Sequence, residues 1–182
     1  MVMNKADEVL RFWFDELSRA QWFSVTQELD AEIRDRFGEL HLAFARGELE
    51  DWRVKPHYHL AAIIVLDQFS RNIYRGTPLA FAADWIALRE ARLAVETGAD
   101  QAVAPERRAF FYLPFEHSEM MEDQERSVSL FTALGDEQYL DYAQRHLDVI
   151  RQFGRFPHRN ALLGRVSTNA ELDYLSKPGA GF

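Results

Sequence analysis

The residues best suited to chemistry lie in one segment, Phe153–Arg165. This segment carries Arg155, His158, Arg159 and Arg165, in a chain whose formal net charge is −8. Two glycines and a proline within it argue against a regular helix. Guanidinium groups form paired hydrogen bonds with carboxylates and phosphates. The segment is therefore predicted to bind an anion, to neutralise acids of the same chain, or to do both. The acids that its arginines could neutralise are Asp67, Asp84, Glu116 and Glu119.

A second polar group lies on an otherwise apolar helix face. Asp67 follows Ile63 and Ile64 at helical spacing, and Arg71 follows four residues later. A carboxylate is costly to bury unless it is paired. Asp67 is therefore either an acid/base or ligand-orienting group, or half of a structural ion pair with Arg71 that closes the helix beside Asn72.

Asp84 repeats this pattern on a face of alanines. Ala80, Ala87 and Ala91 share its side of the predicted helix, which indicates close approach of a second helix. The expected partner of Asp84 is an arginine from elsewhere in the chain.

His117 is the candidate general base. It continues the apolar stripe of Phe110 and Leu113, with Glu116 or Glu119 near enough to orient its ring. The alternative is a hydrogen-bonded core histidine. The histidine spacings match no zinc helix, and no glycine-rich loop has the spacing of a nucleotide-binding motif. We therefore expect no metal and no cofactor.

Together these residues predict a binding site for a small anionic molecule, formed where the Asp67–Asn72 helix end, the His117 turn and the Arg155–Arg165 loop meet. The alternative is a helical module that binds proteins or peptides, in which the same residues form a buried structural network. The sequence indicates no reaction, ligand identity or oligomeric state. The candidate catalytic residues are Asp67 and His117, and the candidate ligand-binding residues are Arg71, Asn72, Arg155, His158, Arg159, Asn160 and Arg165.

The elements that must position these groups are predicted to be helices throughout. Helix starts are expected near Asn4 or Asp7, and near Thr26, Pro56, Thr77-Pro78, Pro105, Gln124 and Asp136. The helix that begins near Pro56 is expected to run to about Tyr74, and a Thr168/Glu171 capping box predicts a last short helix. Pro114 is expected to kink or break its helix. Short connections favour antiparallel neighbours, so we expect an all-α fold in which an array of helix hairpins folds into one globule. Residues 4–176 form the expected single domain, and 177–182 a flexible tail.

Composition narrows the classes of protein. The chain has no cysteine, which excludes disulfides and thiol chemistry. Its start lacks the apolar core of a signal peptide, and its longest apolar run, Leu60–Leu66, is too short to span a membrane. The acidic balance disfavours nucleic-acid binding. A soluble, cytoplasmic protein that binds neither membranes nor nucleic acids is expected.

Seven short motifs occur along the chain in an order that is specific in combination. They are Leu66–Asn72, Phe81–Asp84, Leu113–Glu119, Asp123–Val128, Phe153–Asn160, Leu163–Arg165 and Ser167-Thr168. With these motifs the chain resembles the bacterial domain-of-unknown-function 924 family between about Val9 and Leu175. This resemblance implies an all-helical fold similar to tetratricopeptide hairpins, and no known activity. Two positions differ from the family pattern: Ser70 stands where proline is usual, and Phe115-Glu116 where an apolar pair is usual.

Overall fold

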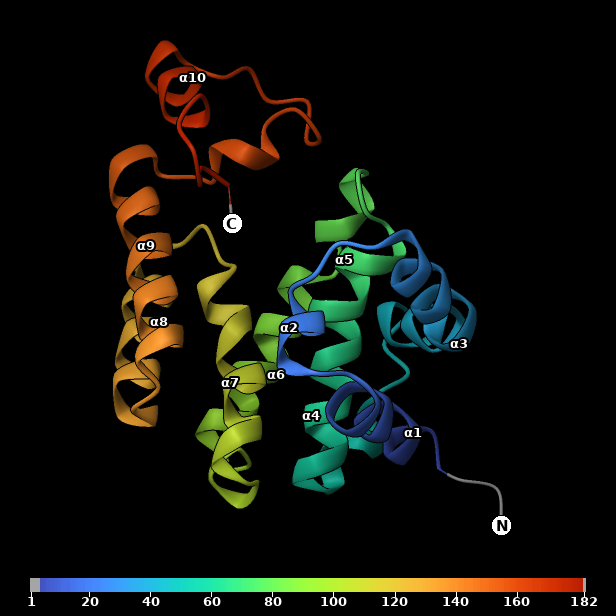
Figure 1. Ribbon diagram of the computed structural model, residues 1–182. Coiled ribbons are helices and arrows are strands. Elements are labelled where there is room, and N and C mark those ends of the chain that lie inside the picture. Colours follow the sequence, from blue (N-terminus) through green and yellow to red (C-terminus); the bar gives the residue numbers. More distant parts are fainter. Residues whose placement is uncertain (1–3, 182) are drawn as a thin grey trace. The chain divides into compact units, whose positions relative to one another are not determined.

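A computed structural model describes residues 4–181 (Figure 1), and within that range every regular element is a helix. The all-α prediction is confirmed. The described residues fall into two compact units, which are treated separately below. The N-terminal unit comprises residues 4–75 and 79–114, and the C-terminal unit comprises 76–78 and 115–181. The expectation of a single domain over 4–176 stays a prediction.

The N-terminal unit begins at a helix capped by Asn4, whose side chain accepts a hydrogen bond from the Ala6 N–H. Thr26 caps the long third helix in the same way, and Pro56 occupies the first turn of α4, as predicted. In chain order, the elements of the N-terminal unit are α1 (Lys5–Arg11), the π-helix η1 (Phe12–Glu16), α2 (Arg19–Trp22), α3 (Gln27–Ala45), η2 (Glu50–Val54), α4 (Pro56–Ile64), the π-helix η3 (Val65–Phe69), α5 (Ser70–Ile73), η4 (Pro78–Phe81), α6 (Asp84–Glu96), η5 (Asp100–Ala102) and α7 (Pro105–Glu116). Two of these elements, η4 and α7, include residues of both units.

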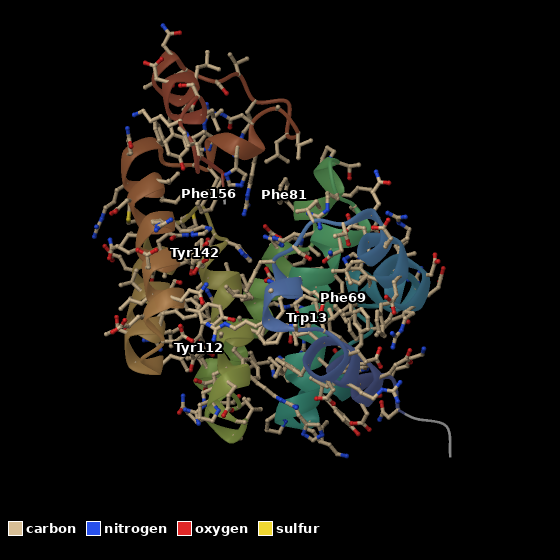
Figure 2. All side chains as sticks on the ribbon, in the orientation of Figure 1. Trp13, Phe69, Phe81, Tyr112, Tyr142 and Phe156 are labelled. Atoms are coloured by element: carbon tan, nitrogen blue, oxygen red, sulfur yellow. The ribbon has the colours of Figure 1, made fainter. Side chains whose placement is uncertain are left out.

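Aromatic side chains fill the core of this unit. Trp13 and Phe69 pack edge to face with their ring centroids 5.5 Å apart (Figure 2), and Phe69 also contacts Phe37 at 4.8 Å. Phe110 brings α7 against Trp13 at 5.7 Å. Edge-to-face contacts of this kind add to the free energy of apolar burial. The four tryptophans of the chain, at positions 13, 22, 52 and 85, all lie in this unit.

The predicted helix from Pro56 to about Tyr74 is present as a continuous helix that contains one π-helical segment. α4, η3 and α5 follow one another directly, and η3 is a π-turn that contains Asp67. A π-turn accommodates an extra residue in a helix and rotates the residues that follow. α3 packs against both η3 and α5, so this turn lies against a helix of the same unit.

The C-terminal unit is built around an antiparallel hairpin of α8 (Met121–Leu134) and α9 (Glu137–Phe153), which lie side by side in Figure 1. Gly135 takes a left-handed conformation with φ of 77°, and Asp136 caps α9 through its side chain. Phe131 and Tyr139 stack at 5.5 Å and fix the hairpin register. The remaining elements are η6 (Pro157–Arg159) and α10 (Asn169–Leu175), the latter with the predicted Thr168/Glu171 capping box.

Two predicted helix boundaries are wrong. Thr77-Pro78 opens only the short η4, and α6 starts at Asp84, where a negative charge suits a helix N-terminus and Arg71 holds the carboxylate. Pro114 does not break α7, which continues to Glu116. The alternative expectation, a kink at Pro114, stays a prediction. The helix end beyond Pro114 is held from outside, because the Gln124 Nε2 donates to the Glu116 carbonyl at 2.6 Å.

The predicted flexible tail has one close neighbour. A Cβ built on Gly181 would lie 2.9 Å from the Cβ of His158, so the chain passes tightly beside η6 there. Flexibility over 177–182 stays a prediction. None of the helices between residues 4 and 181 is long and apolar enough to cross a membrane.

Candidate functional site

The Asp67–Asn72 helix end is an internally paired network of the N-terminal unit. Arg71 donates to both carboxylate oxygens of Asp84, at 3.0 and 3.2 Å, and to the Asp67 carbonyl at 2.6 Å. Its Nη1 also lies 3.4 Å from Asp67 Oδ1. The arginine expected for Asp84 is therefore Arg71, the same residue expected for Asp67.

Asn72 is held by a second pair. Its Nδ2 donates to Asp30 Oδ1 at 2.8 Å, and Arg75 donates to both oxygens of the same carboxylate at 2.6 and 2.9 Å. Burial raises the pKa of Asp30, but the hydrogen bonds from Arg75 and Asn72 outweigh it and lower the pKa. The amide proposed to contact a ligand thus orients a buried carboxylate.

In the C-terminal unit, Arg155 and Arg165 are paired with internal carboxylates. Arg155 donates to both oxygens of Glu171, at 2.6 and 2.8 Å, and to the Val166 carbonyl at 2.8 Å. Arg165 donates to both oxygens of Glu119, at 2.7 and 2.9 Å. Glu119 was among the acids expected to neutralise this loop, whereas Glu171 was expected only as a capping residue.

Glu119 has a third donor, which fixes the loop against the His117 turn. The Phe156 N–H donates to Glu119 Oε1 at 2.8 Å. Burial raises the pKa of Glu119, but the Arg165 and Phe156 hydrogen bonds outweigh this and lower the pKa. Asn160 completes the framework, since its Oδ1 accepts from Arg165 Nε at 2.9 Å and its Nδ2 donates to Ser167 Oγ at 3.0 Å.

A guanidinium and two imidazoles of the C-terminal unit lie around the ring of Phe156, which is labelled in Figure 2. The guanidinium carbon of Arg159 lies 4.8 Å from the Phe156 ring centroid, and the rings of His146 and His158 lie 5.5 and 5.7 Å from it. His117 is 6.3 Å from His146, ring to ring. We call these four side chains, His117, His146, His158 and Arg159, the Phe156 cluster.

Arg159 is the buried cation of this cluster, with 7% of its surface exposed. Its Nη2 donates to the His117 carbonyl at 3.0 Å, which ties η6 to the turn after α7. His117 and His158 are half-buried as residues, and the Nδ1 atom of His158 is shielded from solvent. Between residues 4 and 181, no three histidine, aspartate or glutamate side chains are grouped in a way that could hold a metal ion.

His146 is the cluster residue that the sequence reasoning missed. Its Nδ1 lies 2.8 Å from the Tyr142 carbonyl and 3.3 Å from Glu116 Oε1. A carbonyl accepts only, so Nδ1 carries the proton and Nε2 is the basic nitrogen of the neutral ring. Burial lowers the pKa of His146 well below its usual value, and the neighbouring charges of His117, His158 and Arg159 act in the same direction.

A carboxylate oriented toward a histidine was predicted, but for a different ring. Glu116 was expected to orient His117 and instead lies beside His146. The signal for His146 was present in the sequence: it lies seven residues after Tyr139 and four before Ile150 on the apolar face of α9, the same pattern that singled out Asp67. That the Asp67–Asn72 helix end meets this cluster in one pocket stays a prediction.

Comparison with known proteins places the chain in a family. A family model described as "Bacterial protein of unknown function (DUF924)" matches residues 9–179. The chain belongs to this family. A DUF924-like structure, described as a protein of unknown function from Agrobacterium tumefaciens, is 41% identical, with a TM-score of 0.90 over 94% of this chain and 97% of that one. No curated protein matches the chain. DUF924 membership indicates no specific function, and it confirms the resemblance seen in the sequence.

Proposed function

We propose that the C-terminal unit binds a small anionic molecule at the Phe156 cluster. The observation that carries this proposal is the gathering of a buried guanidinium and two imidazoles around one aromatic ring, with a third imidazole, that of His117, beside His146. Placing like-charged or chargeable groups this close is unfavourable for the protein alone. Placing them around a ligand of opposite charge removes that penalty, and binding sites are where such clusters accumulate.

The pairing of the other arginines narrows the ligand-binding set. Arg155 and Arg165 are occupied by Glu171 and Glu119, so they support the loop instead of contacting the ligand. Of the loop residues predicted from the sequence, the proposal assigns ligand contact to His158 and Arg159. Arg165 and Asn160 then act as positioning residues, because they hold Glu119 and the backbone at Phe156.

A thermal-shift series tests the proposal with sulfate, phosphate and a panel of phosphorylated and carboxylated metabolites. A ligand at a hundred times its Kd stabilises the folded state by about 2.7 kcal/mol, which raises the Tm by roughly 5–10 °C in a chain of this size. The Arg159→Gln variant should lose this rise. The matched control is Arg151→Gln, which removes an exposed arginine from the same unit and should keep it.

Two results would contradict the proposal. In the first, no anion raises the Tm of the natural chain, and in the second, anions raise the Tm of Arg159→Gln as much as that of the natural chain. If Arg159→Gln does not fold, Arg159→Lys and His158→Gln replace it. The lysine variant keeps the charge and should retain part of the rise, and the His158 variant should weaken binding without a large loss of baseline stability.

The alternative function is a helical module that binds proteins or peptides. The internal pairs Arg155–Glu171 and Arg165–Glu119 favour it, because in such a module the polar residues of the loop would stabilise the fold and would not bind a ligand. The same series separates the two functions, since a structural network predicts loss of baseline stability in Arg159→Gln and no anion effect in the natural chain.

We also propose that the protein works in the cytoplasm and that its hairpins pair as in tetratricopeptide proteins. The absence of cysteine supports the first proposal, and the antiparallel α8–α9 hairpin supports the second. Fractionation of cells that express the tagged full chain tests the location.

A further inference from the structure

We infer that the N-terminal unit has a binding site of its own, formed by Arg89 and Trp85 on α6, for a small organic anion in which a phosphate or carboxylate is joined to a flat apolar group. The residues of this site all belong to the N-terminal unit, and none belongs to the Phe156 cluster. The inference therefore goes beyond the proposed function and does not depend on it.

The site is built on Glu90, a carboxylate of α6 with none of its surface exposed. Arg53 donates to it twice, from Nε and Nη2, at 2.7 Å each. Arg89 donates from Nε at 3.1 Å and from Nη2 at 2.9 Å. His59 donates through Nε2 at 3.1 Å, because a carboxylate only accepts. Burial raises the pKa of Glu90, but these hydrogen bonds outweigh burial and hold that pKa well below its usual value.

Glu90 has more hydrogen-bond donors than it needs. An ionised carboxylate offers about four lone-pair positions. Five N–H groups from three side chains are directed at this one. Arg53 makes the two shortest bonds, and such a paired contact is sufficient to balance the buried charge. Arg89 can therefore turn toward a ligand without leaving Glu90 unsatisfied.

The two guanidinium groups also leave positive charge unbalanced. Arg53 and Arg89 lie side by side, because the Nη2 atoms of both donate to the same oxygen, Glu90 Oε1. One carboxylate balances only one of these two permanent charges. Glu50 also attracts Arg53 by its charge, but it is exposed and forms no hydrogen bond with Arg53 within residues 4–181. Water and salt therefore screen the Glu50 charge, and an anion at Arg89 meets a net positive group.

Arg89 is accessible, and it lies beside an open aromatic surface. Its side chain is 52% exposed, and its Nη1 has no partner in the part of the chain that the structure describes. Its guanidinium carbon lies 5.6 Å from the ring centroid of Trp85, which is 63% exposed. An anion can therefore accept charge-assisted hydrogen bonds from Arg89 while the group that carries it packs on the indole.

These two contacts define the class of ligand. Sulfate and inorganic phosphate can use only the guanidinium, and a single contact with a half-exposed charge contributes little. An uncharged aromatic molecule can use only the indole. A molecule that carries both groups uses both contacts at once. Inorganic anions in the thermal-shift series therefore report on the Phe156 cluster, and aromatic anions report on the Arg89–Trp85 site.

The test uses phenyl phosphate, with inorganic phosphate and phenol as matched ligands that lack the ring or the charge. Binding is followed by NMR at the indole N–H of Trp85, so the Kd refers to this site alone. The signal is assigned by its loss in Trp85→Phe. In the natural chain, phenyl phosphate should bind about tenfold more tightly than either matched ligand, since each of those loses one of the two contacts.

Three variants locate the binding. Arg89→Gln should raise the Kd for phenyl phosphate about tenfold, because the charge-assisted contact is lost. Arg46→Gln removes an exposed arginine of the same unit and should leave the Kd unchanged, and so should Arg159→Gln. The inference is overturned if phenyl phosphate does not shift the Trp85 signal, if Arg89→Gln keeps the natural Kd, or if Arg159→Gln raises it. If the Trp85 signal responds and no anion raises the Tm, the site stands and the proposed function fails.

A measurement on the natural chain covers the case in which Arg89→Gln does not fold. The Nε–H signal of Arg89 is followed in the same titration with phenyl phosphate. It should shift with the same Kd as the Trp85 indole signal. A Trp85 signal that shifts while the Arg89 signal stays constant would show that the anion is not bound by this arginine, and would overturn the inference.

Discussion

At the scale of single residues, Glu119 is the residue that joins the His117 turn to the C-terminal loop. It accepts two hydrogen bonds from Arg165 and one from the Phe156 N–H. Charge-assisted, paired bonds of this kind are among the strongest in proteins. The position of Phe156, and with it the cluster around its ring, therefore depends on one carboxylate.

Replacement of this carboxylate should be costly. Glu119→Gln keeps the size of the side chain but removes the charge opposite Arg165, and we expect a loss of about 2 kcal/mol in the free energy of unfolding, since one partner of a partly buried pair is left behind. Urea unfolding measures this loss. As a control, Arg145→Gln breaks the exposed Arg145–Asp141 pair and should change stability by less than about 0.5 kcal/mol. Equal effects from the two substitutions would contradict this account of Glu119.

Ion pairs could be predicted from the sequence where a charged residue interrupts an apolar helix face. Asp84 was expected to pair with an arginine, and Glu119 to pair with the loop, and both pairs are present. Glu171 and His146 were missed for different reasons. Glu171 was assigned to a cap that it does form, and nothing local shows that the same carboxylate also holds Arg155. When two ion-pair partners lie far apart in the sequence, no residue spacing indicates that they will meet in the fold.

At the scale of elements, two glycines have opposite effects on the stability of the helices in which they lie. Gly38 lies inside α3, where a Cβ would meet only Arg34 Cγ at 4.0 Å, and Gly135 ends α8 with φ of 77°. Glycine inside a helix costs conformational entropy without any gain, whereas in the left-handed region it avoids the strain that other residues suffer. The two positions therefore form a natural pair for comparison.

The same substitution should have opposite effects at these positions. We expect Gly38→Ala to stabilise the protein by about 0.5–1 kcal/mol and Gly135→Ala to destabilise it by about 1 kcal/mol. Thermal unfolding of both variants next to the natural chain measures the signs. A destabilising Gly38→Ala would indicate a neighbour that must move to accept the methyl group.

Helix existence and most starts could be predicted from capping residues, because a cap is a local interaction. Asn4, Thr26, Asp136 and Thr168 all cap the helices assigned to them. The π-turns and the late start of α6 could not be predicted, because tertiary packing and the Arg71–Asp84 pair select them over a regular α-helix. The break expected at Pro114 was wrong for a similar reason, because Gln124 of α8 hydrogen-bonds to the helix turn that follows Pro114.

At the scale of the whole molecule, each unit contains a buried histidine whose pKa is lowered by burial. In the N-terminal unit His41 hydrogen-bonds Ser70 Oγ through Nε2 at 2.6 Å, and in the C-terminal unit it is His146. A lowered pKa favours the neutral form of both rings in the folded protein. In the unfolded chain the same rings take up protons near their ordinary pKa of about 6.5.

The sign of the resulting pH dependence follows from this difference. Because the unfolded state binds more protons below about pH 6.5, stability is present above that pH and falls as the solution becomes more acidic. Between about pH 7.5 and 5.5 we expect a loss of at most about 1.4 kcal/mol per pH unit for each ring. Urea unfolding at both pH values measures it, and His41→Gln should reduce the dependence. Stability that rises toward pH 5.5 would contradict neutral buried rings.

The location of the tryptophans gives the two units separate optical signatures. All four indoles belong to the N-terminal unit, where Trp13 is buried against Trp22 at 6.2 Å and Trp85 is 63% exposed. Indole fluorescence therefore follows the melting of that unit, whereas far-ultraviolet circular dichroism sums the helices of both. Coincident transitions in the two signals would mean that the units unfold as one cooperative body, and separated transitions would give each unit its own midpoint. The native chain thus carries its own reporter of cooperativity, without any added dye.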